Sequence, residues 1–302
     1  MSKLVADQAD GLRRLLAQTR TRVLAFASMG RGLGVTTVVT NLSAALAYQG
    51  REVLLLDEHG TDAGTASAAW AVEPLGTLAD VANRRLTLHG AAARAPCGVQ
   101  VLTAVPRTPA GSPDPRMLWE GDVILIDAVL DGEGQLSALA QAADELVLVM
   151  QPHAASITAT YAGIKRLHYA HALRQLRFLV NGVAEPGAAQ QVAHNLAQAG
   201  SRYLAVSLQP AGWVRAEPHM ADAARLRRTV VEAYPASPAA ADCRRIADEM
   251  GQWPWRPGAS LAPQAVPATQ GTNTAAACRK YLEKEEGRPC TPHREPLKSP
   301  IC

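Results

Sequence analysis

Hydrophobic residues occur along much of this chain in short, almost uninterrupted runs. Such runs are typical of strands that are buried on both faces of a parallel sheet. Between them, apolar residues recur at intervals of three and four positions, which predicts helices. The predicted strands are residues 23–27, 53–56, 99–103, 123–126, 146–150, 178–180 and 203–206, and the predicted helices are residues 37–49, 157–173 and 188–199.

Strands that alternate with helices predict an α/β fold: one domain, residues 21–250, with a mainly parallel sheet covered by helices on both faces. Residues 1–20 predict a short amphipathic helix in front of this domain. From residue 251 to 302 the chain is rich in Pro, Ala, Gln and Thr, and then in charge, without periodicity. This composition predicts a disordered tail.

Composition and charge narrow the class of protein. Hydrophobic residues make up 48% and charged residues 19% of the 302 residues, which is typical of a globular protein with a large core. The formal net charge of +3 is too small to indicate nucleic-acid binding, so we expect no direct nucleic-acid partner. The five cysteines have no CxxC spacing, which argues against a zinc site and against a disulfide framework.

The N-terminal residues carry charge throughout and contain no apolar signal-peptide core. No segment approaches the ~20 apolar residues that a membrane-spanning helix needs. We therefore expect a cytoplasmic protein that is at most peripheral to a membrane. Helix 239–250, followed by Trp253 and Trp255, fits either a helix that lies on a membrane surface or a terminal helix packed on the sheet.

A glycine-rich loop over residues 28–34 connects the first predicted strand to the helix that follows it. Its glycines would let backbone N–H groups turn toward an anion, and the helix N-terminus adds partial positive charge. Strand, glycine loop and helix together predict a phosphate-binding loop. The expected nucleotide-binding residues here are Gly30, Arg31, Gly32, Leu33, Gly34, Val35, Thr36 and Thr37.

Polar residues follow three of the predicted strands: Asp57, Asp127 and Asn181. Each aspartate alone is more often a helix cap or a loop residue. In a parallel sheet, however, the carboxyl ends of the strands share one edge, where ligands bind. We therefore expect Thr36, Asp57 and Asp127 to hold Mg²⁺ beside a nucleotide.

A second interpretation is a dinucleotide-binding fold. Gly30, Gly32 and Gly34 follow a strand, and Asp57 closes the next strand. Their spacing is GxGxG rather than GxGxxG, and Asp127 would have no role in such a site. This interpretation is the weaker of the two.

Four segments point to a known family. Residues 27–42 resemble the deviant Walker A loop of the MinD/ParA ATPases, usually KGGxGK[ST]. Residues 54–57 are similar to the family's LLLDAD segment, 122–127 to its Walker B strand and 151–165 to its TPEPTSITDAYALIK stretch. The resemblance implies a P-loop NTPase-type domain, with ATP and Mg²⁺ as cofactors and Asn181 where the family reads adenine.

Within this family, residues 7–15 resemble the DQAxxLR motif of the FlhG (FleN) branch, which regulates flagellar number and position, and residues 234–247 resemble its closing segment. The resemblance runs from about residue 5 to 250. It implies contact with an FlhF-like flagellar GTPase, with a flagellar master transcription regulator, with a second copy of the chain and with the inner face of the cell membrane or the cell pole. The partner-binding residues it implies are Asp7, Gln8, Ala9, Leu12 and Arg13.

The chain departs from the family at its charged positions. Gly30 stands where the family has its signature lysine, and Val35 stands where it has the P-loop lysine. His59 replaces the second Asp of LLLDAD, so Asp57 and His59 are the candidates for a catalytic role. Without the lysines, the charge that develops at the γ-phosphate loses its main stabiliser. We expect lost or very weak ATP hydrolysis; the alternative is an active ATPase switch in which Arg31 replaces a lysine.

Overall fold

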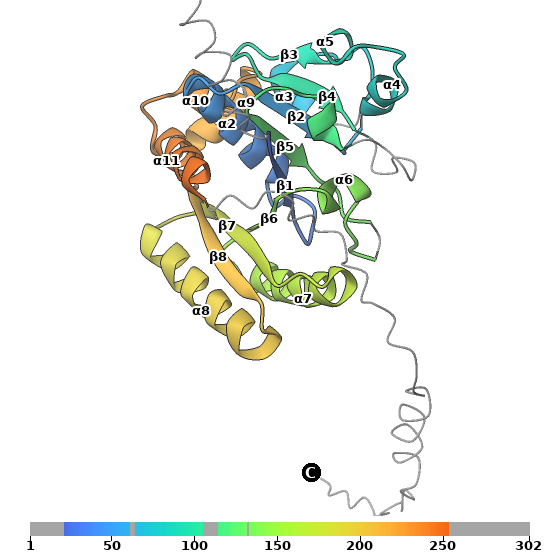
Figure 1. The fold of residues 1–302 in the computed structure, drawn as a ribbon. Coiled ribbons are helices and arrows are strands. Elements are labelled where there is room, and N and C mark those ends of the chain that lie inside the picture. Colours follow the sequence, from blue (N-terminus) through green and yellow to red (C-terminus); the bar gives the residue numbers. More distant parts are fainter. Residues whose placement is uncertain (1–20, 61–63, 105–113, 132, 254–302) are drawn as a thin grey trace, which may run out of the picture. The chain divides into compact units, whose positions relative to one another are not determined.

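The computed structural model describes residues 21–60, 64–104, 114–131 and 133–253 (Figure 1). The predicted helix over residues 1–20, with Asp7, Gln8, Ala9, Leu12 and Arg13, lies outside this part of the chain, as do residues 254–302 of the predicted tail.

A single eight-stranded sheet runs through the described residues, in the order β3-β4-β2-β5-β1-β6-β7-β8. All neighbouring pairs are parallel except β3 and β4. The strands are β1 (Arg22–Ala27), β2 (Val53–Asp57), β3 (Ala93–Arg94), β4 (Gln100–Thr103), β5 (Val123–Asp127), β6 (Glu145–Met150), β7 (Gln175–Val183) and β8 (Ser207–Arg215).

Helices cover both faces of this sheet (Figure 1). Alternate residues of a strand enter different cores: Ala25 packs in one core with Ile164 of α7, whereas Phe26 packs in the other with Leu42 of α2 and Ile246 of α11. The helices are α2 (Val35–Tyr48), α3 (Ala66–Trp70), α4 (Leu78–Ala82), α5 (Leu88–Ala91), the 3-10 helix η1 (Pro115–Met117), α6 (Ala138–Gln141), α7 (Ala154–His171), α8 (Pro186–Leu204), α9 (Pro218–Arg225), α10 (Val230–Ala233) and α11 (Pro238–Gln252). The predicted α/β architecture is confirmed.

The strand order rules out the dinucleotide-binding interpretation. In that fold the second strand lies directly beside the first. Here β5 lies between β1 and β2 and pairs with both. This arrangement brings Asp127, at the end of β5, next to the loop that follows β1.

One predicted strand is wrong. Residues 203 and 204 end α8, residues 205 and 206 are in neither a helix nor a strand, and β8 begins at Ser207. Among the described strands, β8 lies at the edge of the sheet and pairs with β7 alone, and its residues range from buried to exposed. The strand also contains Pro210 and Gly212. Both residue types are rare inside strands, so they weaken the sequence pattern that would predict a strand here.

Helix α11 is fixed to the domain. Its apolar residues, among them Cys243, Ile246 and Met250, are buried against the core that includes α2. This packing supports the terminal-helix interpretation of residues 239–250, because their apolar face is not free to enter a membrane surface. The helix continues to Gln252, and Trp253 is buried. Among the described helices, none is long and apolar enough to cross a bilayer.

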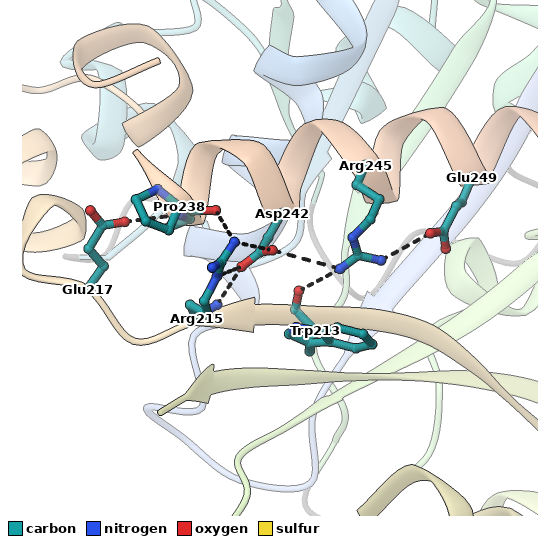
Figure 2. A network of polar contacts seen from close by, with 8 residues as sticks. Trp213, Arg215, Glu217, Pro238, Asp242, Arg245 and Glu249 are labelled. Carbon is teal, nitrogen blue, oxygen red and sulfur yellow. Dashed lines mark hydrogen bonds and ion pairs between the residues drawn. The ribbon is translucent and has the colours of Figure 1, made fainter. Parts of the chain in front are cut away.

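A polar network joins α11 to the edge strand β8 (Figure 2). Arg215 donates from Nε to Asp242 Oδ2 at 2.8 Å and from an Nη to Asp242 Oδ1 at 3.0 Å. Arg245 donates to Glu249 at 3.0 Å, and its guanidinium lies over the ring of Trp213 at 4.5 Å. The two hydrogen bonds between the Arg215 guanidinium and the Asp242 carboxylate fix the position of the helix along the strand.

Candidate nucleotide and metal site

The glycine loop contains two residues in the left-handed backbone region. Gly32 and Gly34 have φ of 74° and 86°, a region that favours glycine. Gly34 immediately precedes α2, and a Cβ at that position would clash with Nδ2 of Asn181. A side chain at residue 34 would therefore displace the Asn181 amide, which holds the loop by its hydrogen bond to Leu33, and would strain the backbone at a positive φ.

A cavity of about 720 Å³ opens against the loop. The cavity is lined by residues 28–37, by His59 and by the segment that follows β5. The structure thus brings Gly30, Arg31, Gly32, Leu33, Gly34, Val35, Thr36 and Thr37 together around one space, as the sequence predicts. Asp57, Asp127 and Asn181 are not among the residues that line it.

The two positions that carry lysine in the family contribute no charge to this cavity. Gly30 has no side chain, and Val35 is 8% exposed and packs in the apolar core behind the loop. Two arginines do line the cavity, Arg31 from the loop and Arg166 from α7. Arg166 was not predicted, because a single arginine on an exposed helix face is not distinguished by any pattern in the sequence. Its position directly after the 151–165 stretch, which resembles the family, is the one feature that could have pointed to it.

Asn181 binds the loop itself. Its Nδ2 donates to the carbonyl of Leu33 at 3.0 Å, and Gln151 Nε2 donates to the carbonyl of Gly32 at 3.4 Å. Gln151 directly follows β6, the neighbour of β1, and Asn181 lies near the end of β7, the next strand of the sheet, so both residues position the loop on the sheet. The role of Asn181 in reading adenine stays a prediction.

Asp57 and Asp127 are register partners at the ends of two neighbouring strands, β2 and β5. Both side chains are fully buried. The backbone N–H groups of His59 and Ala66 donate to the two oxygens of Asp57 at 2.9 and 2.7 Å. Neither oxygen of Asp127 has a hydrogen bond, although the Thr36 hydroxyl is close enough to affect its pKa.

Burial raises the pKa of Asp127 to about 7, and the carboxylates of Asp57 and Glu58 add to this rise. His59 and the Thr36 hydroxyl oppose it. Since a buried charge without a partner is costly, Asp127 takes up a proton far more readily than an ordinary carboxyl group. The three residues predicted to hold the metal, Thr36, Asp57 and Asp127, do converge at one place.

His59 points into this cluster. Its Nδ1 lies 3.3 Å from Oδ1 of Asp57 and 3.4 Å from Oδ2 of Asp127. The Asp57 carboxylate raises the pKa of His59 above its usual value, and burial opposes that shift. The family's aspartate at this position is thus replaced by a side chain that adds a nitrogen donor, and positive charge when it is protonated.

Glu58 is a buried residue of the site that the sequence analysis missed. Its carboxylate accepts hydrogen bonds from Ser137 Oγ at 2.5 Å and from the Val129 N–H at 2.9 Å. Burial raises its pKa, and these hydrogen bonds oppose the rise. Glu58 thereby fixes the segment after β5 that forms one wall of the cavity.

These residues fit a Mg²⁺–nucleotide complex poorly. Mg²⁺ prefers an octahedral shell of oxygen atoms and keeps several of its waters. The imidazole nitrogen of His59 faces the two carboxylates where such waters would lie, and neither family lysine is present to offset the charge of a triphosphate.

Comparison with known proteins agrees with the fold and the motifs. No protein-family model matches the chain. The chain is 30% identical to the antiactivator FleN of Pseudomonas aeruginosa over 247 residues. The aligned residues cover 77% of this chain and 87% of that protein.

Solved structures of MinD share the fold. The MinC:MinD cell division complex of Aquifex aeolicus matches with a TM-score of 0.63 and 19% identity, over 78% of this chain and 98% of that one. MinD of Pyrococcus horikoshii, in complex with Mg-ADP, matches with a TM-score of 0.61 and 24% identity, over 76% of this chain and 96% of that one. Together with the FleN match, the glycine loop and the strand-end aspartates, these findings show that the chain belongs to the FleN (FlhG) branch of the MinD/ParA family.

Proposed function

We propose that this chain regulates flagellar number and placement by binding protein partners, and that it does so with little or no ATP turnover. The observation that carries the second half of the proposal is Val35, which packs in the apolar core at the position of the P-loop lysine. The first half is supported by the similarity to an antiactivator, FleN of Pseudomonas aeruginosa.

The remaining chemistry of the loop supports weak phosphate binding at most. Backbone N–H groups at the start of α2 and the helix dipole attract an anion. Catalysis needs more, because charge on the transferred phosphoryl group must be stabilised as it develops, and loss of one such donor typically costs about 3 kcal/mol of barrier. Both lysines that would provide this stabilisation are absent.

ATP hydrolysis by the purified full chain tests the proposal directly. We expect phosphate release far below that of a MinD/ParA protein with an intact KGGxGK[ST] loop measured alongside. Thr36→Ala should leave the residual rate unchanged. Turnover at the rate of the intact protein, abolished by Thr36→Ala, would show that the loop is active and that the proposal is wrong.

The finer proposal concerns the partners. We propose that Asp7, Gln8, Ala9, Leu12 and Arg13 contact an FlhF-like flagellar GTPase, and that the chain also binds a flagellar master transcription regulator. Gln8→Ala or Leu12→Ala should weaken stimulation of the GTPase, whereas Tyr169→Ala, an exposed residue on α7, should not. Equal stimulation by all of these variants would contradict the assignment.

An ATP-driven dimerising switch is the second candidate, and Arg31 and Arg166 favour it. Guanidinium groups bind phosphate well, and both line the cavity beside the loop. Calorimetry with ATP and ADP separates the candidates. Tight ATP binding that Arg166→Ala weakens, with dimerisation on ATP addition, would favour the switch; no measurable heat would favour regulation without nucleotide.

A further inference from the structure

We propose that Asp57, His59 and Asp127 form a binding site for a divalent transition-metal ion, of the class that accepts imidazole nitrogen and carboxylate oxygen, with Zn²⁺ as its representative. One ligand atom from each residue lies within 4.8 Å of the other two. The inference is independent of the proposed regulatory function, because it concerns only what these three side chains can hold.

The distances match the geometry of a metal site better than that of a hydrogen-bonded pair. In a tetrahedral site with metal–ligand bonds of about 2.05 Å, neighbouring ligand atoms lie about 3.3 Å apart. Nδ1 of His59 lies 3.3 and 3.4 Å from one oxygen of each carboxylate, and it makes no hydrogen bond. Its position between two carboxylates is that of a third ligand around a shared centre.

Asp127 supplies an independent observation. Its side chain is fully buried, yet both of its carboxylate oxygens lack a hydrogen bond. Buried polar groups without partners are rare and costly. An ion bound between Asp127 and His59 would satisfy two such atoms at once.

The surroundings of the cluster favour a cation. Asp57, Glu58 and Asp127 bring three buried carboxyl groups together around one imidazole. The backbone hydrogen bonds from His59 and Ala66 orient the Asp57 carboxylate, as groups around a metal ligand commonly do. The Thr36 hydroxyl lies on the side of Asp127 and could complete the shell, or a water could.

The donor set selects the metal. Imidazole suits Zn²⁺, Co²⁺ and related ions, whereas Mg²⁺ and Ca²⁺ prefer oxygen alone. The lack of CxxC motifs argues against a zinc site built on cysteine, but it does not apply to a site built on one imidazole and two carboxylates. Replacement of the family's second aspartate by His59 therefore changes the preferred class of ion, rather than only removing a catalytic group.

Metal titration of the full chain tests the inference, after removal of bound metals with a chelator. In calorimetry with Zn²⁺ we expect one tight site per chain, and with Mg²⁺ a far weaker one. Co²⁺ should give the visible ligand-field absorption of a site with nitrogen and oxygen ligands. His59→Ala and Asp127→Asn each remove a metal ligand and should weaken Zn²⁺ binding by more than the roughly 10- to 100-fold that is typical when a group behind a ligand is lost.

His194→Ala is the matched control, because His194 is exposed on α8 and far from the strand ends in sequence; it should bind Zn²⁺ as the unmodified chain does. Circular dichroism shows whether each variant is folded. Zn²⁺ should raise the Tm of the unmodified chain and of His194→Ala, but not that of folded His59→Ala. No tight Zn²⁺ site in the unmodified chain, or equal affinity in folded His59→Ala, would overturn the inference.

Discussion

Asp127 Oδ2 and His59 Nδ1 lie 3.4 Å apart where β5 and β2 end, beneath the glycine loop. The pKa of Asp127 is raised to about 7, chiefly by burial, and the pKa of His59 is raised, chiefly by Asp57. In the folded protein both groups therefore bind a proton more readily than they do in the unfolded chain.

The sign of the pH dependence follows from these shifts. For a group with a raised pKa in the folded state, the stabilisation is complete below the unfolded pKa and is lost as the pH rises through the folded pKa. For Asp127 the window runs from 3.8 to about 7. In metal-free protein we expect the free energy of unfolding, from urea titrations, to fall by about 2 kcal/mol from Asp127 alone between about pH 5 and pH 7.

Asp127→Asn should remove most of this slope, because an amide does not titrate. Asp222→Asn, which changes an exposed carboxylate on α9, should leave the slope as it is. If Asp127→Asn and the unmodified chain lose stability equally over this range, the carboxyl group of Asp127 does not carry the effect.

Val35→Lys should restore part of the nucleotide affinity. Residue 35 lies on the wall of the cavity at the start of α2, so a lysine there can reach into the space beside the loop. A hydrogen bond to a charged group contributes about 1.5–3 kcal/mol, which corresponds to a gain in ATP affinity of roughly tenfold or more. Calorimetry measures it, and Val35→Met, of similar length without charge, is the control that should show no gain.

Asp242→Asn should loosen α11 from the edge strand. The change weakens two charge-assisted hydrogen bonds from Arg215, and Asp242 is buried, so we expect a loss of about 2 kcal/mol in the free energy of unfolding. Asp222→Asn breaks an exposed pair with Arg225 and should cost less than about 0.5 kcal/mol. Equal losses in the two variants would show that the network in Figure 2 adds little to stability.

Trp253→Ala should destabilise the domain by about 3 kcal/mol, a cost typical of truncating a buried aromatic side chain. Trp253 is 8% exposed, and the Arg177 guanidinium lies over its ring at 4.2 Å. Urea titration measures the loss. Met117→Ala, at a residue that is 79% exposed, should have almost no effect, and a similar loss there would contradict the role of burial.

The sequence predicted the central strands well because they are buried on both faces and therefore appear as continuous apolar runs, as in 53–57 and 123–127. Strand β8 escaped prediction because an edge strand has mixed burial and here includes Pro210. The sequence leaves two interpretations of Trp253 open, a membrane-surface residue or a packed one, since a tryptophan next to a helix with basic residues gives the same pattern whether lipid or protein covers it.

The loop of the candidate site was predictable because glycine spacing between a strand and a helix is a local pattern. The grouping of Asp57 with Asp127 was predictable as well, because both follow strands of a parallel sheet, but the 3.4 Å contact of Asp127 with His59 was not, since it depends on β2 and β5 being direct neighbours. Arg166 was missed because it reaches the site from α7 without a motif of its own, and Glu58 because its role depends on hydrogen bonds with Ser137 and Val129, which lie far away in the sequence.

Arg22, the first residue of β1, donates from one Nη to the carbonyls of Met250 and Trp253 at 2.7 and 3.2 Å. A central strand of the sheet is thus held by the C-terminal end of α11 and the residue that follows it. During synthesis on the ribosome, this link cannot form until residue 253 has left the exit tunnel, so the domain completes its folding only after residues beyond 253 have been made. A chain that stops before residue 250 would leave the Arg22 guanidinium without these two carbonyl acceptors, and should be selected for degradation rather than accumulate as a partly active fragment.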